Sequence, residues 1–497
     1  MNPSILDRFK FSFLANVFRS VSVIVAGMLL ARSLGPQEYG TMMFLLGTLI
    51  ALQQLTDLGS STAFFTFIGQ QQRSKKFVRF YVLWLITQFS IPFILIWLIF
   101  PDEVIKLVWS GEKRSLVLLA FTANYFQSTM WTAMAQMGES QRLTRAVQGV
   151  SLLVSVCHVC LISLFWFYDA LSITSVFILL TLEWFLAISF MGSLLSFPKS
   201  SHCDDDIRSI FKEFYSYCAP LILYTFLSFV YQFSDRWLLQ EFSGSVDQAY
   251  YAVGYQFSAI ALLATQSVLN IFWKEISEFN FNNNKDALIK LYRQVSRSMY
   301  FISASACFFV MPWAEDILQL VLGEEYVNGY LVLCIMLVYP LHQSLGQIVT
   351  TMMYATERVK AHVTIGGMFL AVSIFVSYFI LAPEDSFVPG YELGSLGLAG
   401  KMVVMQFLTI NTISFYLAYS LEISFDWRYQ IASVIICAAA GWISFEVTHL
   451  IFDSSTSIFI RFAFSSLAYL IFIVTSLVFK PSLVGITRSD INQFISK

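Results

Sequence analysis

The sequence predicts an all-α polytopic membrane protein with about 14 transmembrane helices. Of its 497 residues, 57% are hydrophobic and 12% are charged, whereas a typical soluble domain carries about 25% charged residues. Apolar stretches of about 20 residues recur along the whole chain, and this is the helix length that crosses a hydrocarbon core roughly 30 Å thick. These stretches lack the alternation of polar and apolar residues that is typical of barrel strands, so helices are expected.

The predicted spans follow one another with short polar connections. The first span has a longer apolar stretch than the 7 to 15 residues of a signal peptide's core, so we expect it to stay in the protein. The spans cover residues 11–33, 41–62, 80–100, 115–137, 147–168, 173–196, 214–239, 250–273, 298–319, 329–352, 361–381, 396–420, 429–448 and 457–479.

The basic residues predict the orientation. With a cytoplasmic amino terminus, 22 of the 30 Lys and Arg residues fall on the inner face, and only Lys106, Lys113 and Arg114 fall on the outer face. This asymmetry follows the positive-inside rule and predicts that both termini are cytoplasmic. The basic residues are spread over many loops and form no patch with interleaved aromatic residues, so a nucleic-acid partner is not expected.

The seven cysteines do not indicate a disulfide framework or a metal site. Six lie inside predicted spans, and Cys203 lies in an inner loop. The stretch "CHVC" at 157–160 lies inside a span without a second pair of ligands, which favours small core side chains over metal ligands. The sequence therefore predicts reduced cysteines, no metal and no cofactor.

A weak internal repeat divides the chain into two halves. In "LLARSLGPQEYGTMMF" (29–44) and in "RWLLQEFSGSVDQAYYAVGYQF" (236–257), a basic residue is followed by Gly, an acidic residue, Tyr and Gly before the chain returns. Two unrelated helical hairpins can also look alike in this way. The predicted organisation is an N-terminal six-helix half (1–197), a cytoplasmic linker (198–213), a C-terminal six-helix half (214–420), and two extra helices with a cytoplasmic tail (421–497).

Five stretches carry a resemblance to a known family. They are "LARSLGPQEYG" (30–40), "LTDLGSSTAFFTFIG" (55–69), "SDRWLLQEFSGSVDQAYYAVGY" (234–255), "LVLGEEYVNGYLVL" (320–333) and "LGSLGLAGKMVV" (393–404). In this order they resemble the polysaccharide transporter branch of the MOP exporter superfamily, which includes the O-antigen flippases of the Wzx type. Gly35 and Pro36 would turn the chain at the outer surface, with Arg32 at the mouth.

The resemblance implies a function and a location. It implies a MATE/MOP-like fold of two six-helix halves around a central cavity, followed by a C-terminal hairpin, in the bacterial inner membrane. It also implies a polyprenyl-pyrophosphate-linked oligosaccharide, such as an O-antigen repeat unit of lipopolysaccharide, as cargo. The expected partners are this lipid-linked substrate, membrane lipids and other polysaccharide-assembly proteins. The halves would rock so that the cavity opens alternately inward and outward, without enzymatic chemistry.

Polar side chains inside the spans are candidates for the substrate pathway, because they are costly in a bilayer. A pyrophosphate needs cationic hydrogen-bond donors, and Arg19 is the first candidate. Arg19 and Asp57 lie at heights that differ by about 4 to 5 Å, so an ion pair between them is the structural alternative. Neutral polar side chains suit either sugar hydroxyls or interhelical hydrogen bonds. The full predicted pathway set is Arg19, Arg32, Asp57, Asn124, Gln127, Asp235, Arg236, Asn270, His342 and Lys401.

Two other functions stay open from the sequence. A MATE-like ion-coupled exporter of drugs or metabolites would share the two-half fold, but it usually has twelve spans. A membrane enzyme of polysaccharide assembly, such as a polymerase or a ligase, is expected to carry catalytic residues on a sizeable outer loop. Here every predicted outer loop has about 15 residues or fewer, and no nucleophile with a base appears.

Overall fold

The computed structural model describes residues 5–71, 73–195, 206–453 and 455–485, and within these ranges all regular structure is helical. Eleven helical stretches of the described chain are long and apolar enough to cross a membrane. The prediction of an all-α polytopic membrane protein is confirmed, and the described part of each of the fourteen predicted spans is largely helical. The chain divides into two compact units, Met1–Ala249 and Tyr250–Lys497. The finer domain boundaries at 197, 213 and 420 stay predictions.

Two of the eleven stretches, Ala15–Asp57 and Ile207–Ile260, are long because each joins two predicted spans. Helix α1 (Ile5–Asp57) is kinked at Gly35, with φ 69° and ψ 170°, and α10 (Ile222–Ile260) is kinked at Gly244, with φ 84° and ψ −176°. Positive φ is left-handed backbone that glycine adopts without the steric penalty of a Cβ atom. The repeat seen in the sequence therefore corresponds to the same backbone feature in both helices, a kink at a glycine with positive φ.

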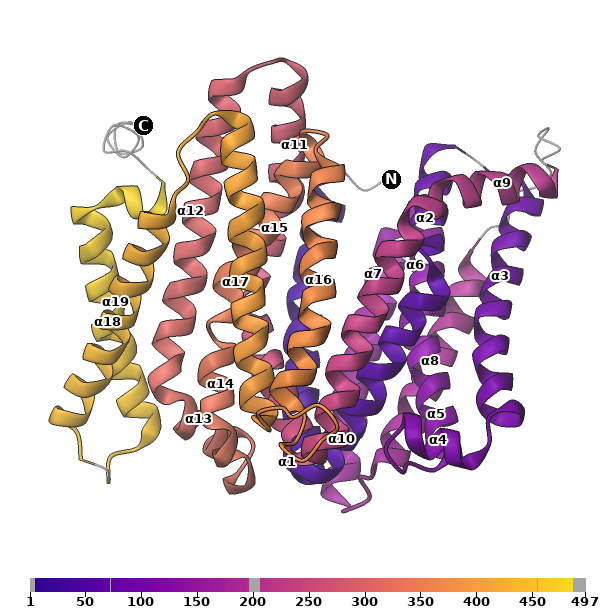
Figure 1. Cartoon of the computed structure of the whole chain (residues 1–497), viewed down its shortest axis with the longest axis horizontal. Coiled ribbons are helices and arrows are strands. Elements are labelled where there is room, and N and C mark those ends of the chain that lie inside the picture. The colour runs from indigo at the N-terminus through magenta and orange to yellow at the C-terminus, as the bar shows by residue number, and fades with distance from the viewer. Residues whose placement is uncertain (1–4, 72, 196–205, 454, 486–497) are drawn as a thin grey trace. The chain divides into compact units, whose positions relative to one another are not determined.

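The first unit is built around the long helix α1, which packs along α7, α5 and α8. Helix α8 packs in turn against α5, α6 and α7 (Figure 1). Besides α1 and the first part of α10, the elements of this unit are α2 (Ser60–Gln70), α3 (Lys75–Ile94), the π-helical η1 (Leu95–Ile99), α4 (Asp102–Val108), α5 (Arg114–Asn124), the π-helical η2 (Tyr125–Met130), α6 (Trp131–Ser140), α7 (Thr144–Phe167), α8 (Ile173–Leu194), α9 (Ile207–Cys218) and η3 (Ala219–Leu221).

The short helix α9 packs against α2 and α3 through a charged and aromatic cluster. The Arg73 guanidinium donates to both carboxylate oxygens of Glu213, at 3.0 and 2.7 Å. It also lies 5.2 Å from the ring centroid of Phe67 and 4.9 Å from that of Phe77. Such a bidentate pair is stronger than a neutral hydrogen bond. The first part of the predicted linker, 198–205, lies outside the described residues, and its last part begins this docked helix.

The second unit is organised around α12, which packs against α11, α15 and α18. The predicted C-terminal hairpin is formed by α18 and α19 (yellow in Figure 1), and α18 joins it to the unit. The elements are α11 (Leu263–Phe281), α12 (Lys285–Val310), η4 (Met311–Trp313), α13 (Ala314–Val321), η5 (Glu324–Gly329), α14 (Tyr330–Met336), α15 (Tyr339–Ala355), α16 (Val359–Leu381), α17 (Gly394–Leu421), α18 (Trp427–Ile451), α19 (Ile458–Phe479) and η6 (Pro481–Val484).

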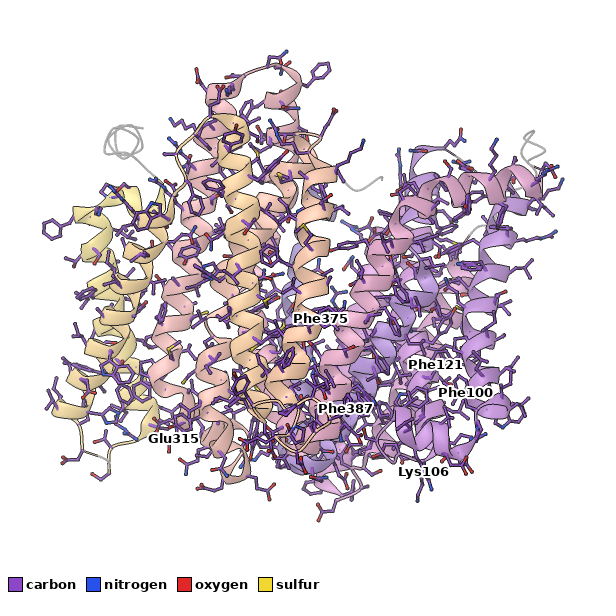
Figure 2. All side chains as sticks on the ribbon, viewed as in Figure 1. Phe100, Lys106, Phe121, Glu315, Phe375 and Phe387 are labelled. Carbon is purple, nitrogen blue, oxygen red and sulfur yellow. The ribbon has the colours of Figure 1, made fainter. Side chains whose placement is uncertain are left out.

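The exposed surface of the helices is apolar along their length. Phe375 on α16 is 69% exposed, and many other large hydrophobic side chains are similarly exposed. Charged side chains gather at helix ends in each unit, as Lys106 does in the first and Glu315 in the second (Figure 2). An apolar flank with charged ends is what a helix in contact with lipid requires.

Candidate functional site

A row of polar side chains runs along α10 in the first unit. Ser228, Gln232, Arg236 and Gln240 are four residues apart, so they share one face of the helix. The Gln232 amide donates to Ser228 Oγ at 3.1 Å and to Gln54 Oε1 on α1 at 2.8 Å. Together with its neighbours this row joins α10 to α1. We call the set the polar seam, and it consists of Thr41, Gln54, Ser228, Gln232, Arg236, Gln240 and Ser245.

Arg236 lies in the middle of the polar seam beside a glycine of α1. A Cβ atom on Gly47 would lie 3.1 Å from Arg236 Nε, so the absence of a side chain there makes room for the guanidinium stem. Arg236 Nη1 donates to Gln248 Oε1 at 3.3 Å, and the Gln248 amide donates back to the Arg236 carbonyl oxygen. The neighbouring Asp235 is buried. These contacts hold a cation inside the helical bundle.

The two repeat segments contact each other at one end of the polar seam, through residues that follow the kinks at Gly35 and Gly244. Thr41 Oγ1 lies 2.9 Å from Ser245 Oγ. A Cβ atom on Gly40 would overlap the Ser245 carbonyl oxygen, so the backbones of α1 and α10 are in direct contact there. The repeat motif is thus part of the packing between the two kinked helices of the first unit.

Asp57 and Arg19 do not pair in the described part of the chain. The Asp57 carboxylate accepts hydrogen bonds from Ser60 Oγ at 2.8 Å, from the Ser61 amide at 3.0 Å and from Ser61 Oγ at 2.9 Å. It therefore caps the start of α2, where unpaired amide groups favour a negative charge. Arg19 is half-buried, and the described side chains give it neither a hydrogen-bond nor an ion-pair partner.

A second polar cluster lies at the π-helical turn η2. Ser128 Oγ lies 2.6 Å from Gln53 Oε1 and 2.7 Å from the Asn124 carbonyl oxygen. The amide nitrogens of Gln53 and Asn124 are buried and have no hydrogen-bond partner among the described atoms. Gln127, on the same turn, is exposed. Single π-helical turns are often found at functional sites. Here the unpaired buried donors of Gln53 on α1 and of Asn124 at the end of α5 lie beside one.

In the second unit, the predicted residues lie on separate helices. His342 on α15 is 6% exposed and Lys401 on α17 is 3% exposed. The His342 ring lies edge-on to Tyr300 and Phe407, with centroids 5.7 and 4.9 Å away. Its Nδ1 atom has no hydrogen-bond partner among the described atoms. Asn270 lies on α11, but its side chain is outside the described set.

Sequence reasoning missed several members of these clusters. Gln53 and Gln54 are adjacent amides within a predicted span, and Gln232 lies one helical turn before Arg236. The four-residue spacing of Ser228, Gln232, Arg236 and Gln240 is the sequence signal that could have predicted the α10 side of the polar seam. Arg32, which was predicted, is exposed on α1.

The chemistry of these clusters is that of hydrogen bonding. Amide, hydroxyl and guanidinium groups inside an apolar bundle can hold sugar hydroxyls or phosphate oxygens in place of water. Within the described residues, no group of three His, Cys, Asp or Glu side chains is arranged to hold a metal ion.

Comparison with known proteins adds a family match. The profile of a family described as polysaccharide biosynthesis protein matches residues 8–274. No curated protein sequence matches the chain.

The solved structures give the fold. A lipid II flippase MurJ in an inward closed conformation is 13% identical, with a TM-score of 0.70 over 97% of this chain and 100% of that one. A multidrug resistance MATE transporter of the MOP superfamily, in an inward-facing conformation, is also 13% identical, with a TM-score of 0.61 over 81% of this chain and 94% of that one. A MOP superfamily transporter from Pyrococcus furiosus is 11% identical, with a TM-score of 0.54 over 83% of this chain and 94% of that one. The predicted MOP-type fold is confirmed.

Proposed function

Because this chain belongs to the polysaccharide biosynthesis protein family, we propose that it is a flippase that moves a polyprenyl-pyrophosphate-linked oligosaccharide from the inner to the outer leaflet. The cargo would be an O-antigen repeat unit or a similar surface-polysaccharide unit. The observation that carries the proposal is the polar seam, which holds Arg236 and the amide side chains of Gln54 and Gln232, among others, within apolar helices. The MOP-type flippase fold supports it.

The proposed pathway divides into two kinds of contact. Arg19, Arg32, Arg236 and Lys401 would meet the pyrophosphate, because guanidinium and ammonium groups form charge-assisted hydrogen bonds with phosphate oxygens. Asn124, Gln127 and Asn270 would meet sugar hydroxyls. The remaining members of the proposed pathway are Asp57, Asp235 and His342, which would line it without binding the pyrophosphate.

The proposed transport cycle is alternating access in the bacterial inner membrane. The cavity opens first to the inner face and then to the outer face, while the polyprenyl tail stays in the bilayer. Both termini face the cytoplasm, as the distribution of basic residues predicts. Membrane lipids surround the protein, and other polysaccharide-assembly proteins supply and use the cargo.

The first test replaces Arg19 in a strain that depends on this protein for its surface polysaccharide. Arg19→Ala is expected to lower the amount of polysaccharide about tenfold or more, because a hydrogen bond to a charged group is worth about 1.5–3 kcal/mol. Arg19→Lys keeps the charge and is expected to retain most of the transport. The measurement is surface polysaccharide per cell, normalised to the amount of membrane-inserted protein.

The control is Arg79→Ala, which removes an exposed cation from α3 and is expected to leave the polysaccharide unchanged. A normal amount of polysaccharide with Arg19→Ala would remove Arg19 from the pathway. A MATE-like exporter is the second candidate, since the MATE fold also matches. Resistance to drugs that rises with expression, without any effect on polysaccharide, would favour it.

A further inference from the structure

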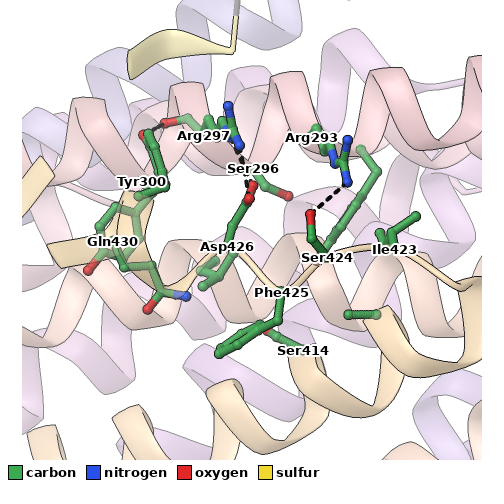
Figure 3. A pocket seen from close by; sticks show the side chains of 14 residues that line it. Arg293, Ser296, Arg297, Tyr300, Ser414, Ile423, Ser424, Phe425, Asp426 and Gln430 are labelled. Atoms are coloured by element: carbon green, nitrogen blue, oxygen red, sulfur yellow. Dashed lines mark hydrogen bonds and ion pairs between the residues drawn. The ribbon is translucent and has the colours of Figure 1, made fainter. Parts of the chain in front are cut away.

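A small cavity in the second unit is lined by none of the proposed pathway residues, although one of its lining side chains, Tyr300, packs edge-on against His342. It forms where α12 meets the end of α17 and the connection 422–426 that leads into α18 (Figure 3). Its volume is about 40 Å³, and a single ordered water needs about 10–15 Å³. The cavity therefore has room for a group of a few heavy atoms but not for a sugar ring.

One cation at the cavity is already neutralised. Arg297 donates to both carboxylate oxygens of Asp426, each at 2.9 Å, and its guanidinium lies 5.0 Å from the Tyr429 ring centroid. The Tyr429 hydroxyl lies 2.6 Å from the Arg297 carbonyl oxygen and 2.7 Å from that of Leu483. Arg297 and Asp426 thus line the cavity as an ion pair with no net charge (Figure 3).

The second cation, Arg293, keeps donors that the described protein does not use. Its Nη2 donates to Ser424 Oγ at 3.1 Å, while its Nε is buried without a partner among the described atoms. Ser296 Oγ on α12 and Ser414 Oγ on α17 are also buried without a hydrogen-bond partner among the described atoms. These two serines are 8% and 5% exposed, and both line the cavity with Arg293. A buried donor without a partner is unfavourable, so a bound acceptor would relieve this cost.

We propose that this cavity binds a phosphate group. Three donors from two helices line it, and the Arg293 charge is left over after Arg297 and Asp426 cancel. A phosphate oxygen accepts from guanidinium and hydroxyl groups at once. Ser424, at the mouth, is exposed. This end of α12 also carries Lys290 and Lys285, of which Lys285 pairs with Glu422 at 3.0 Å. Basic pockets between transmembrane helices on the cytoplasmic side bind anionic lipid head groups.

The bound phosphate group could come from two sources, an anionic phospholipid head group or free inorganic phosphate. The first experiment uses purified full-length protein. In one arm, native mass spectrometry counts bound phosphatidylglycerol against phosphatidylcholine. In the other arm, thermal unfolding is followed while inorganic phosphate replaces chloride at constant ionic strength. Saturable binding of phosphatidylglycerol alone identifies the lipid, and saturable stabilisation by phosphate alone identifies the free ion.

The site is tested by variants in both arms. Arg293→Gln, and the double variant Ser296→Ala with Ser414→Ala, are each expected to weaken binding about tenfold or more. Arg293→Lys is expected to bind with an affinity between those of these variants and the wild type. Because it keeps the charge, it serves as a folded comparison if Arg293→Gln fails to fold. Arg428→Gln removes a nearby exposed cation that does not line the cavity, and it is expected to bind as the wild type does.

Two results would overturn the proposal. One is the absence of saturable binding in both arms, which would mean that water alone satisfies the donors. The other is equal binding by the wild type and by both cavity variants.

Discussion

Replacing Gly40 by alanine is expected to destabilise the protein by about 3 kcal/mol, the upper end of what overpacking usually costs. The new Cβ atom would overlap the Ser245 carbonyl oxygen, and this neighbour is backbone that cannot rotate away. The α1–α10 contact would have to separate, and the hydrogen bond between Thr41 and Ser245 would lengthen. The measurement is thermal unfolding of the purified protein in detergent.

Gly149→Ala on α7 is the matched control, because a Cβ atom there meets nothing within 4 Å. Alanine is a better helix former than glycine by roughly 1 kcal/mol, so this variant is expected to be as stable as the wild type or slightly more so. If Gly40→Ala unfolded at the same temperature as Gly149→Ala, the inferred direct backbone contact between the kinked helices would be wrong.

Arg236→Ala is expected to reduce transport strongly, so that surface polysaccharide falls by about 10-fold to 100-fold. The guanidinium is the cation of the polar seam, and losing a hydrogen bond to a charged group costs about 1.5–3 kcal/mol. Arg236→Lys keeps the charge but not the planar fork of donors, so it is expected to transport at an intermediate rate. Surface polysaccharide per cell is measured beside the amount of folded protein.

The amount of folded protein separates a substrate role from a structural one. Arg236 also bonds to Gln248 across the kink at Gly244, so a purely structural residue would lower protein amount and transport together. The expected result is normal protein with lost transport. Lys113→Ala, which removes an exposed cation from the predicted outer face, is the control. Transport that falls only in proportion to protein would contradict the substrate role.

The helical spans could be predicted from the sequence because hydropathy over about 20 residues is set by the bilayer itself. The kinks could also be located, since Gly35 followed by Pro36 can hardly continue an ordinary helix. The fourth predicted span was correct as helix, although its polar residues keep it out of the eleven apolar stretches. Its π-helical turn was not predictable, because the extra residue per turn is decided by packing.

The candidate site could be predicted only in part. Arg236 was found because a charge within a span is costly. The contact between Gln54 and Gln232 became visible only when α1 and α10 were placed side by side. For Asp57, the alternative of an ion pair with Arg19 assumed a distant partner. The structure uses the carboxylate locally instead, on Ser60 and Ser61. Capping α2 does not require Asp57 to order the long side chain of a distant arginine. The depth of Asp57 in the membrane alone cannot distinguish this cap from an ion pair with Arg19.

The most direct test of flippase function is the position of the lipid-linked oligosaccharide after this protein is depleted. For a flippase, we expect polyprenyl-pyrophosphate-linked repeat units to accumulate on the inner leaflet while surface polysaccharide disappears, and re-expression of the wild type to reverse both changes. Normal surface polysaccharide without such accumulation would contradict flippase function, and the exporter function would then take its place.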